Sequence, residues 1–473
     1  MKRLVTIPLL ASVAALPLLL VAARGRPAPE RAPAAAQEAE INPVVRDCNT
    51  TLPPATVTRA IATGGLPCAV AADSPFTLAR LQVAFDFNSW LTFVALNAPS
   101  SGAASTGTAA SGAVPAADAP SVWEGWQDLF SLIMPDGSPP PPFGEAVPVP
   151  AICRNVGSGE VMQMISKTPV TPVVSVSGQP LRSGPLIDQN GHYARYQILV
   201  NRPMYDYIVA NRLYSRIGQA HFKRNVTFPM GQVDSGTVGR VGAIVIKAAW
   251  KVLDPKDPND APSRFHVMHA RIYTPPSEGV TASCRPGTLG LVGLHIVHKT
   301  RFEPQWNWAT FEHVDNVPTA AETAAEMPAR HYNFYRQGCS ARNCPPNAQP
   351  PRPWDATRDP FPHGFHSQIV RTTTYPPEAT ASADTWNAQF HAALAGTVWT
   401  NYRLVTTQWP TNPTSAKDPN GMPFPLLAAN TTMESYVQGN VLNASSSCMA
   451  CHGNATTVNG RPSDFSFILE RAH

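Results

Sequence analysis

The stretch "LGLVGLHIVHKT" at residues 289–300 is rich in β-branched and other apolar residues, a composition typical of a β-strand. Turn clusters such as "DPKDPNDAP" (254–262) and "TPPSEG" (274–279) break this part of the chain into short pieces. Their spacing favours antiparallel pairing over β-α-β units. Further strand-like stretches lie on both sides: "HYARYQILV" (192–200), "GRVGAIVIKAAWKVL" (239–253), "RFHVMHARIYT" (264–274), "WNWATFEHV" (306–314) and "TVWTNYRLVTTQW" (397–409).

Helical patterns flank these strands. In "FDFNSWLTFVALNAP" (85–99) apolar residues recur at helical spacing, with Asp86 as the expected N-cap and Pro99 beyond the end. The stretch "ADTWNAQFHAALAG" (383–396) shows a similar apolar face. We therefore expect an α+β fold, with an antiparallel β-rich central domain, flanking helices and a short helical C-terminal segment that carries the attachment motif described below.

The expected organisation has four regions. These are a signal peptide or N-terminal anchor at 1–23, a linker at 24–45, a β-rich domain with long loops at 46–380, and a C-terminal helical segment at 381–473.

The N-terminus "MKRLVTIPLLASVAALPLLLVAARG" has the pattern of a secretory signal peptide. Lys2 and Arg3 form a basic start, and an apolar stretch follows, interrupted by Pro8 and Pro17. The alternative is an anchor that stays uncleaved, and only then would the protein contact a membrane. Both alternatives export the chain, so a periplasmic or secreted location is expected.

Composition limits the possible partners. The chain has 473 residues, a formal net charge of +4 and only 14% charged residues. It lacks the basic runs interleaved with aromatic residues that nucleic-acid-binding proteins use, so no nucleic-acid partner is expected. The mild positive balance is compatible with an acidic redox partner.

Cysteine usage agrees with export. The chain has eight cysteines, and a motif near the C-terminus takes Cys448 and Cys451. An even number remains, as expected for disulfides in an oxidising compartment. A local bridge is expected across "CSARNC" between Cys339 and Cys344. The further expected pairs are Cys48–Cys68 and Cys153–Cys284, and the alternative is that some of these cysteines stay as buried thiols.

The motif lies in "SSSCMACHGN" (445–454), where Cys448, Cys451 and His452 form one C-x-x-C-H. This pattern attaches a c-type haem: the two thiols bind the vinyl groups, and the histidine binds iron from the proximal side. A redox dithiol or half a zinc site also uses C-x-x-C. The adjoining histidine, the export signal and the lack of a second C-x-x-C favour one covalent haem.

The residues around the motif support this interpretation. Upstream, Asn430 or Thr431 is expected to cap a helix beginning near Thr432, with Glu434 as the capping-box partner of Thr431. Downstream, "DFSFILERA" (464–472) is apolar on one face and is expected to pack beside the haem.

Cys448, Cys451 and His452 behind a signal peptide resemble the site of a c-type cytochrome. The segments "NTTMESYVQ…SSCMACH" and "GLHIVHKT…WNWATFEHVDNVP" resemble those of large bacterial periplasmic proteins described as cytochrome c family. That group implies no particular reaction. The chain departs from small cytochromes c in one respect: no methionine follows Met449, so the sixth iron ligand cannot come from its usual downstream position.

Four sources of a distal ligand therefore remain open. The first is an upstream methionine, Met433 or Met422, and the second is a strand histidine, His295 or its alternate-face neighbour His298, or His313. The third is a histidine from the loop and helix that precede the motif, namely His363, His366 or His391. The fourth is an iron with no protein ligand on its distal side.

The sequence supports three functional hypotheses. The first is an exported monohaem c-type cytochrome that transfers electrons to a redox partner protein. The second is a haem-dependent oxidoreductase or peroxidase with a small-molecule substrate pocket over the distal haem face. The third is a binding protein with a structural haem. Lys247, inside an apolar strand, is either a partner for a haem propionate or an outward-facing surface residue.

Overall fold

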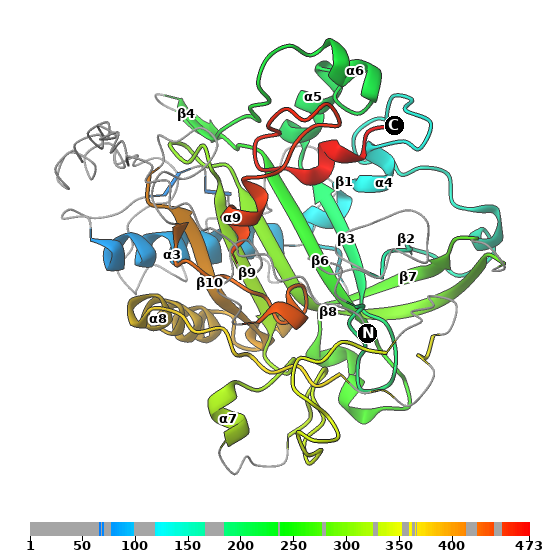
Figure 1. Cartoon of the computed structure of the whole chain (residues 1–473), viewed down its shortest axis with the longest axis vertical. Coiled ribbons are helices and arrows are strands. Elements are labelled where there is room, and N and C mark those ends of the chain that lie inside the picture. The colour runs from blue at the N-terminus through cyan, green and yellow to red at the C-terminus, as the bar shows by residue number, and fades with distance from the viewer. Residues whose placement is uncertain are drawn as a thin grey trace, which may run out of the picture.

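The computed structural model of the chain is shown in Figure 1. It describes residues 66–67, 69–70, 77–98, 119–165, 184–234, 237–276, 281–324, 330–351, 359–361, 365, 367–412, 423–438 and 447–473. The predicted signal peptide and linker, Met422, His363, His366 and the Cys48–Cys68 bridge lie outside the described residues.

The centre of the protein is one nine-stranded sheet, as counted over the described residues. Its main path runs β1-β3-β6-β8-β9-β10-β11 with antiparallel pairing, while β7 pairs with the first half of β8 and β2 pairs with β7 in parallel. A separate hairpin joins β4 to β5. The strands are β1 (Gln127–Asp128), β2 (Glu160–Met162), β3 (Arg195–Val200), β4 (Gln232–Asp234), β5 (Thr237–Arg240), β6 (Ile244–Val252), β7 (Val267–Thr274), β8 (Ser283–His298), β9 (Asn307–His313), β10 (Tyr402–Pro410) and β11 (Pro423–Phe424).

All six predicted strands are confirmed, and with them the α+β fold with an antiparallel sheet. β8 begins six residues before its predicted start, because Ser283 to Leu289 pair with β7. β10 pairs with β9, so the predicted C-terminal segment at 381–473 contributes a strand to the central sheet.

The two faces of the sheet bury different clusters of apolar side chains. One face, here called the front face, carries Val245, Val297 and Trp308. The other, the back face, carries Ile246 and Leu294. Because successive strand residues point to opposite faces, the residue that follows each of these along its strand points to the other face of the sheet.

Two long helices cover the back face. They are α3 (Leu78–Leu96) and α8 (Pro377–Ala393), which lie together beside β10 in Figure 1. The Trp90 ring stacks on Phe390 with ring centroids 4.9 Å apart, and Phe93 stacks on Phe311 of β9 at 4.3 Å. The remaining helices are α4 (Leu129–Leu132), α5 (Arg202–Ala210), α6 (Arg216–His221), α7 (Ala320–Ala324) and α9 (Cys448–His452).

The prediction that Asp86 caps the first helix is wrong. Thr77 is the N-cap, and Asp86 lies fully buried in the middle of α3. Its Oδ1 accepts hydrogen bonds from Gln82 Nε2 (2.8 Å) and Thr407 N (3.1 Å), and its Oδ2 accepts one from Ser382 Oγ (2.6 Å). Asp86 therefore joins α3, α8 and β10 through buried polar contacts.

Two disulfides are present among the described residues. Cys153 is joined to Cys284 and Cys339 to Cys344, which confirms both predicted pairs. The first links a short 3-10 turn to β8 across 131 residues of sequence, and the second closes a surface loop.

The front face is covered by α5 and by the C-terminal segment. Met204 and Ile208 of α5 are buried in the same cluster as Ile468 and Leu469. In Figure 1 the red C-terminal segment lies across the front of the sheet, with α9 close to β10. In the described part of the chain, no helix has the length and apolar character needed to cross a lipid bilayer.

Candidate haem-attachment site

The C-x-x-C-H motif forms α9, and β10 holds its N-terminus. The Ser447 side chain caps the helix by accepting a hydrogen bond from Ala450 N. The Gln408 side chain of β10 accepts a hydrogen bond from Met449 N at 2.8 Å and contacts Ser447 Oγ at 3.2 Å. Gln408 is fully buried, so the sheet fixes where this short helix begins.

The two motif cysteines lie on one edge of α9. Cys448 and Cys451 occupy positions i and i+3 of the helix and are both partly exposed. Side chains with this spacing are neighbours on a helix surface. Both thiols can therefore meet one edge of a flat prosthetic group.

The imidazole of His452 is held in one orientation. Its Nδ1 lies 2.8 Å from the carbonyl oxygen of Phe465, so Nδ1–H donates and Nε2 keeps its lone pair. The Trp308 ring lies 4.6 Å from the imidazole, and the Phe467 ring lies 5.0 Å from it, between centroids. A neutral imidazole oriented by a backbone carbonyl is the arrangement that metal-binding histidines use.

The segment after the motif packs against His452 and the front face of the sheet. Phe467 of the 464–472 stretch contacts His452, while Ile468 and Leu469 are buried on the front face. Asp464 pairs with Lys299 Nζ at 2.5 Å and accepts a hydrogen bond from Phe228 N at 2.6 Å. These contacts fix the loop that supplies the Phe465 carbonyl.

Lys247 of β6 is the polar side chain in contact with the other ring nitrogen of His452. Lys247 Nζ lies 3.4 Å from His452 Nε2, and Lys247 is half-buried. The alternative of an outward-facing surface lysine is therefore wrong. Lys247 pairs in register with His295 of β8, so their side chains lie side by side on the front face.

Two of the predicted distal ligands are brought to this region. His295 Nε2 lies 3.4 Å from the carboxylate of Glu434, and both side chains are buried. Met433 is fully buried in the front-face cluster that also contains Trp308 and Met449.

His313 is not brought to His452. It lies five residues beyond Trp308 along β9, which is roughly 17 Å of extended chain. Its Nε2 contacts the Arg264 carbonyl at 2.9 Å and its Nδ1 accepts a hydrogen bond from Asp315 N at 3.2 Å. Burial lowers its pKa to about 4. His313 therefore serves as a neutral structural histidine.

His391 is likewise engaged elsewhere. It lies on α8, which covers the back face, and its Nε2 contacts the carbonyl of Tyr402 at 2.6 Å. His298 is also buried. Its two ring nitrogens have no hydrogen-bond partner in the described structure, and burial lowers its pKa to about 3.

The predicted helix beginning near Thr432 is replaced by a turn followed by a 3-10 turn, Ser435–Val437. The Glu434 carboxylate accepts a backbone hydrogen bond as a capping-box residue would, but the donor is Asn430 N, at 2.8 Å, and not Thr431 N. The Asn430 side chain accepts from Thr432 N at 2.8 Å. Thr431 N donates instead to Glu312 Oε1 of β9 at 2.5 Å, so the sheet directs the backbone of this turn.

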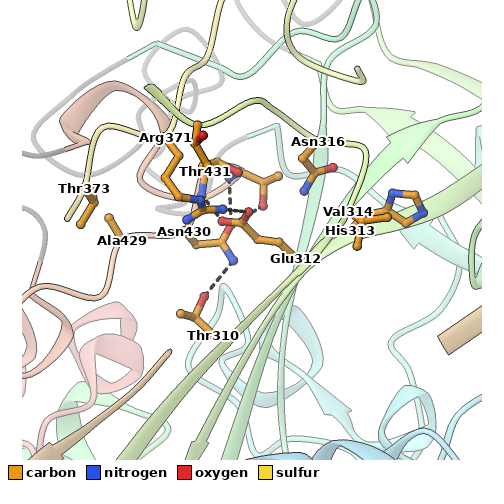
Figure 2. A network of polar contacts seen from close by, with 12 residues as sticks. Thr310, Glu312, His313, Val314, Asn316, Arg371, Thr373, Ala429, Asn430 and Thr431 are labelled. Carbon is orange, nitrogen blue, oxygen red and sulfur yellow. Dashed lines mark hydrogen bonds and ion pairs between the residues drawn. The ribbon is translucent and has the colours of Figure 1, made fainter. Parts of the chain in front are cut away.

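Figure 2 shows the polar network that joins this turn to the sheet. Arg371 forms an ion pair with Glu312, whose carboxylate also receives Thr431 N. Asn430 Nδ2 donates to Thr310 Oγ1 at 2.9 Å and to the Phe311 carbonyl at 3.0 Å. Glu312 and Arg371 are both buried, so this network replaces water around two charges.

Arg371 and Tyr375 lie near Cys448 of the motif. Burial raises the pKa of Tyr375 to about 12, Arg371 lowers it, and Cys448 is close enough to contribute a small further rise. Arg371 Nη1 is buried without a hydrogen-bond partner in the described structure. Sequence reasoning missed this group, because Glu312 and Arg371 are 59 positions apart and meet only once the sheet has formed.

Comparisons with protein-family models, with curated proteins and with solved structures find no match for this chain.

Proposed function

We propose that this protein is an exported monohaem c-type cytochrome that transfers electrons. Cys448 and Cys451 would form the two thioether bonds, and His452 Nε2 would bind the iron. The observation that carries the proposal is the orientation of His452. Its Nδ1–H donates to the Phe465 carbonyl, which leaves Nε2 as the only ring nitrogen able to bind a metal.

The residues present fit the group. The two cysteines share one edge of α9, as thioether attachment requires, and His452 follows them on the same helix. Arg371, with its buried and unpartnered Nη1, is suited to a propionate carboxylate. When bound, haem supplies one-electron chemistry, and the protein supplies orientation and a largely apolar setting through Trp308 and Phe467.

Electron transfer is favoured over a reaction at the iron because nitrogen donors face the site. Lys247 and His295 lie side by side on the strands opposite His452. A protein nitrogen on the distal side would fill the sixth coordination position and leave no place for a substrate. A haem-dependent oxidoreductase or peroxidase would need that position open.

The proposal is tested by producing the full chain in a host that attaches c-type haem. The wild type should keep its haem through denaturing electrophoresis, and the pyridine haemochrome spectrum should report thioether attachment. Cys448→Ser and Cys451→Ser should each lose one thioether, shifting that spectrum, and the double variant should lose covalent haem altogether. Cys339→Ser/Cys344→Ser is the matched control, because it removes two distant cysteines and should keep the haem. A folded wild type without covalent haem would overturn the proposal.

A further inference from the structure

Resting on the proposed haem attachment, we propose that Lys247 supplies the sixth ligand to the haem iron, opposite His452. Lys247 Nζ lies in contact with the ring nitrogen of His452 that would bind the iron. The inference depends on three features: the direction of the His452 lone pair, the spacing between the two nitrogens and the fixed position of β6.

The lone pair of His452 Nε2 is directed toward Lys247. Nδ1–H is committed to the Phe465 carbonyl, so a metal can bind the ring only at Nε2. In the structure Lys247 Nζ lies 3.4 Å from Nε2. Any metal bound at Nε2 therefore lies on the side where this amine stands.

The spacing is close to that of two axial ligands. A metal–imidazole nitrogen bond is about 2 Å long, so two nitrogens on opposite sides of one metal are about 4 Å apart. The nitrogens of His452 and Lys247 are 3.4 Å apart, so they would have to move apart by about 0.6 Å to hold a metal between them. The flexible four-carbon stem of lysine can supply that movement without any change in the backbone.

The backbone beneath Lys247 is fixed. β6 is an inner strand, paired with β3 on one side and β8 on the other, where Lys247 is in register with Ile198 and His295. The alternation of β6 directs Lys247 to the front face, since its neighbour Ile246 lies in the back-face cluster. Lys247 therefore presents its amine to α9 from a rigid support.

Two of the competing donors within the described residues, His295 and Met433, have other neighbours. His295 Nε2 faces the buried carboxylate of Glu434 at 3.4 Å, and Glu434 also accepts a hydrogen bond from Asn430 N. Met433 is fully buried among apolar side chains. Lys247 is the donor already in contact with the iron-binding nitrogen, and on binding iron its ammonium would release one proton to water.

The test uses the purified full-length holoprotein in its ferric state and reads the spin state by absorption and electron paramagnetic resonance spectroscopy. The wild type should be low-spin and six-coordinate. Lys247→Ala should keep its covalent haem, lose the low-spin signal and, once reduced, bind carbon monoxide at least tenfold more tightly than wild type. Added methylamine, which replaces the missing amine, should restore the low-spin signal.

His295→Ala and Met433→Leu are the matched controls and should remain low-spin. A low-spin Lys247→Ala protein with its haem attached would overturn the inference, as would a high-spin wild type. Loss of the low-spin signal in His295→Ala or Met433→Leu alone would assign the ligand there instead. All of these outcomes leave the attachment proposal standing. That proposal fails separately, if no covalent haem is present in the wild type.

Discussion

Replacing Glu312 with glutamine should destabilise the protein strongly, because the Glu312 carboxylate is the counter-ion of buried cations. Glu312 is fully buried and pairs with Arg371, which is only 8% exposed. Arg403 of β10 is in direct cross-strand register with Glu312, and burial, with a further contribution from Arg371, lowers the pKa of Arg403. Removing the Glu312 charge would leave two buried guanidinium groups close together without their shared carboxylate.

The expected cost is about 3–5 kcal/mol, which is the usual effect of removing one partner from a buried ion pair. Two hydrogen bonds to the Glu312 carboxylate, from Arg371 and Thr431 N, are at stake, and each hydrogen bond to a charged group is worth about 1.5–3 kcal/mol. Glutamine can keep the bond from Thr431 N through its carbonyl oxygen. The loss of stability should therefore come mainly from the broken interaction with Arg371.

Urea unfolding followed by tryptophan fluorescence measures this effect. With a urea dependence of about 3 kcal/mol per molar, the midpoint should fall by about 1–1.7 M. A cycle with Arg371→Met provides the control, since the double variant removes both charges. It should be clearly more stable than the sum of the two single losses predicts. A loss below about 1 kcal/mol in Glu312→Gln, or simple additivity in the cycle, would refute the assignment of Glu312 as a buried counter-ion.

Three further outcomes are expected. Gly293→Ala should cost about 1–3 kcal/mol in the same urea assay, because the added Cβ would lie 2.1 Å from Thr432 Oγ1; Gly293→Ala/Thr432→Ala should recover most of that loss, and no recovery would contradict the packing argument. Cys153→Ser/Cys284→Ser should lower the free energy of unfolding by about 2–5 kcal/mol, since the bridge spans 131 residues of sequence; an unchanged urea midpoint would count against a structural bridge. Burial raises the pKa of Asp86 from its ordinary 3.8 to about 6, so protonation of Asp86 adds stability that is fully present below about pH 4 and lost as the pH rises through 6. Unfolding measured between pH 3 and 7 should show this loss, roughly 2–3 kcal/mol, in the wild type but not in Asp86→Asn, and equal profiles would refute it.

The strands were predictable because their signal is local. β6, β8 and β9 each carry a run of apolar and β-branched residues bounded by turn residues, and no distant partner is needed to recognise that pattern. The C-x-x-C-H motif is equally local. The alternation of His295 and His298 between the two faces also follows from strand geometry alone.

The predictions that proved wrong concern polar residues whose hydrogen-bond partners are distant in the sequence. Asp86 resembled a cap because it interrupts an apolar run, but its partners Ser382 and Thr407 lie about 300 residues away in sequence. Thr431 and Glu434 matched the capping-box pattern, but Thr431 N is taken by Glu312 of β9. A local sequence pattern cannot predict such competition, because the competing acceptor comes within reach only after the sheet has formed.

The C-x-x-C-H motif depends on the sheet for its position in the same way. α9 is too short to orient itself, and Gln408 of β10 and the Phe465 carbonyl fix its start and its histidine. The surface opposite His452 comes from Trp308 of β9 and Lys247 of β6. These side chains converge only when β6, β8, β9 and β10 are paired, so the sheet and the attachment helix form one site. The domain before the motif is therefore part of the haem environment that we propose, rather than an appendage to a small electron carrier.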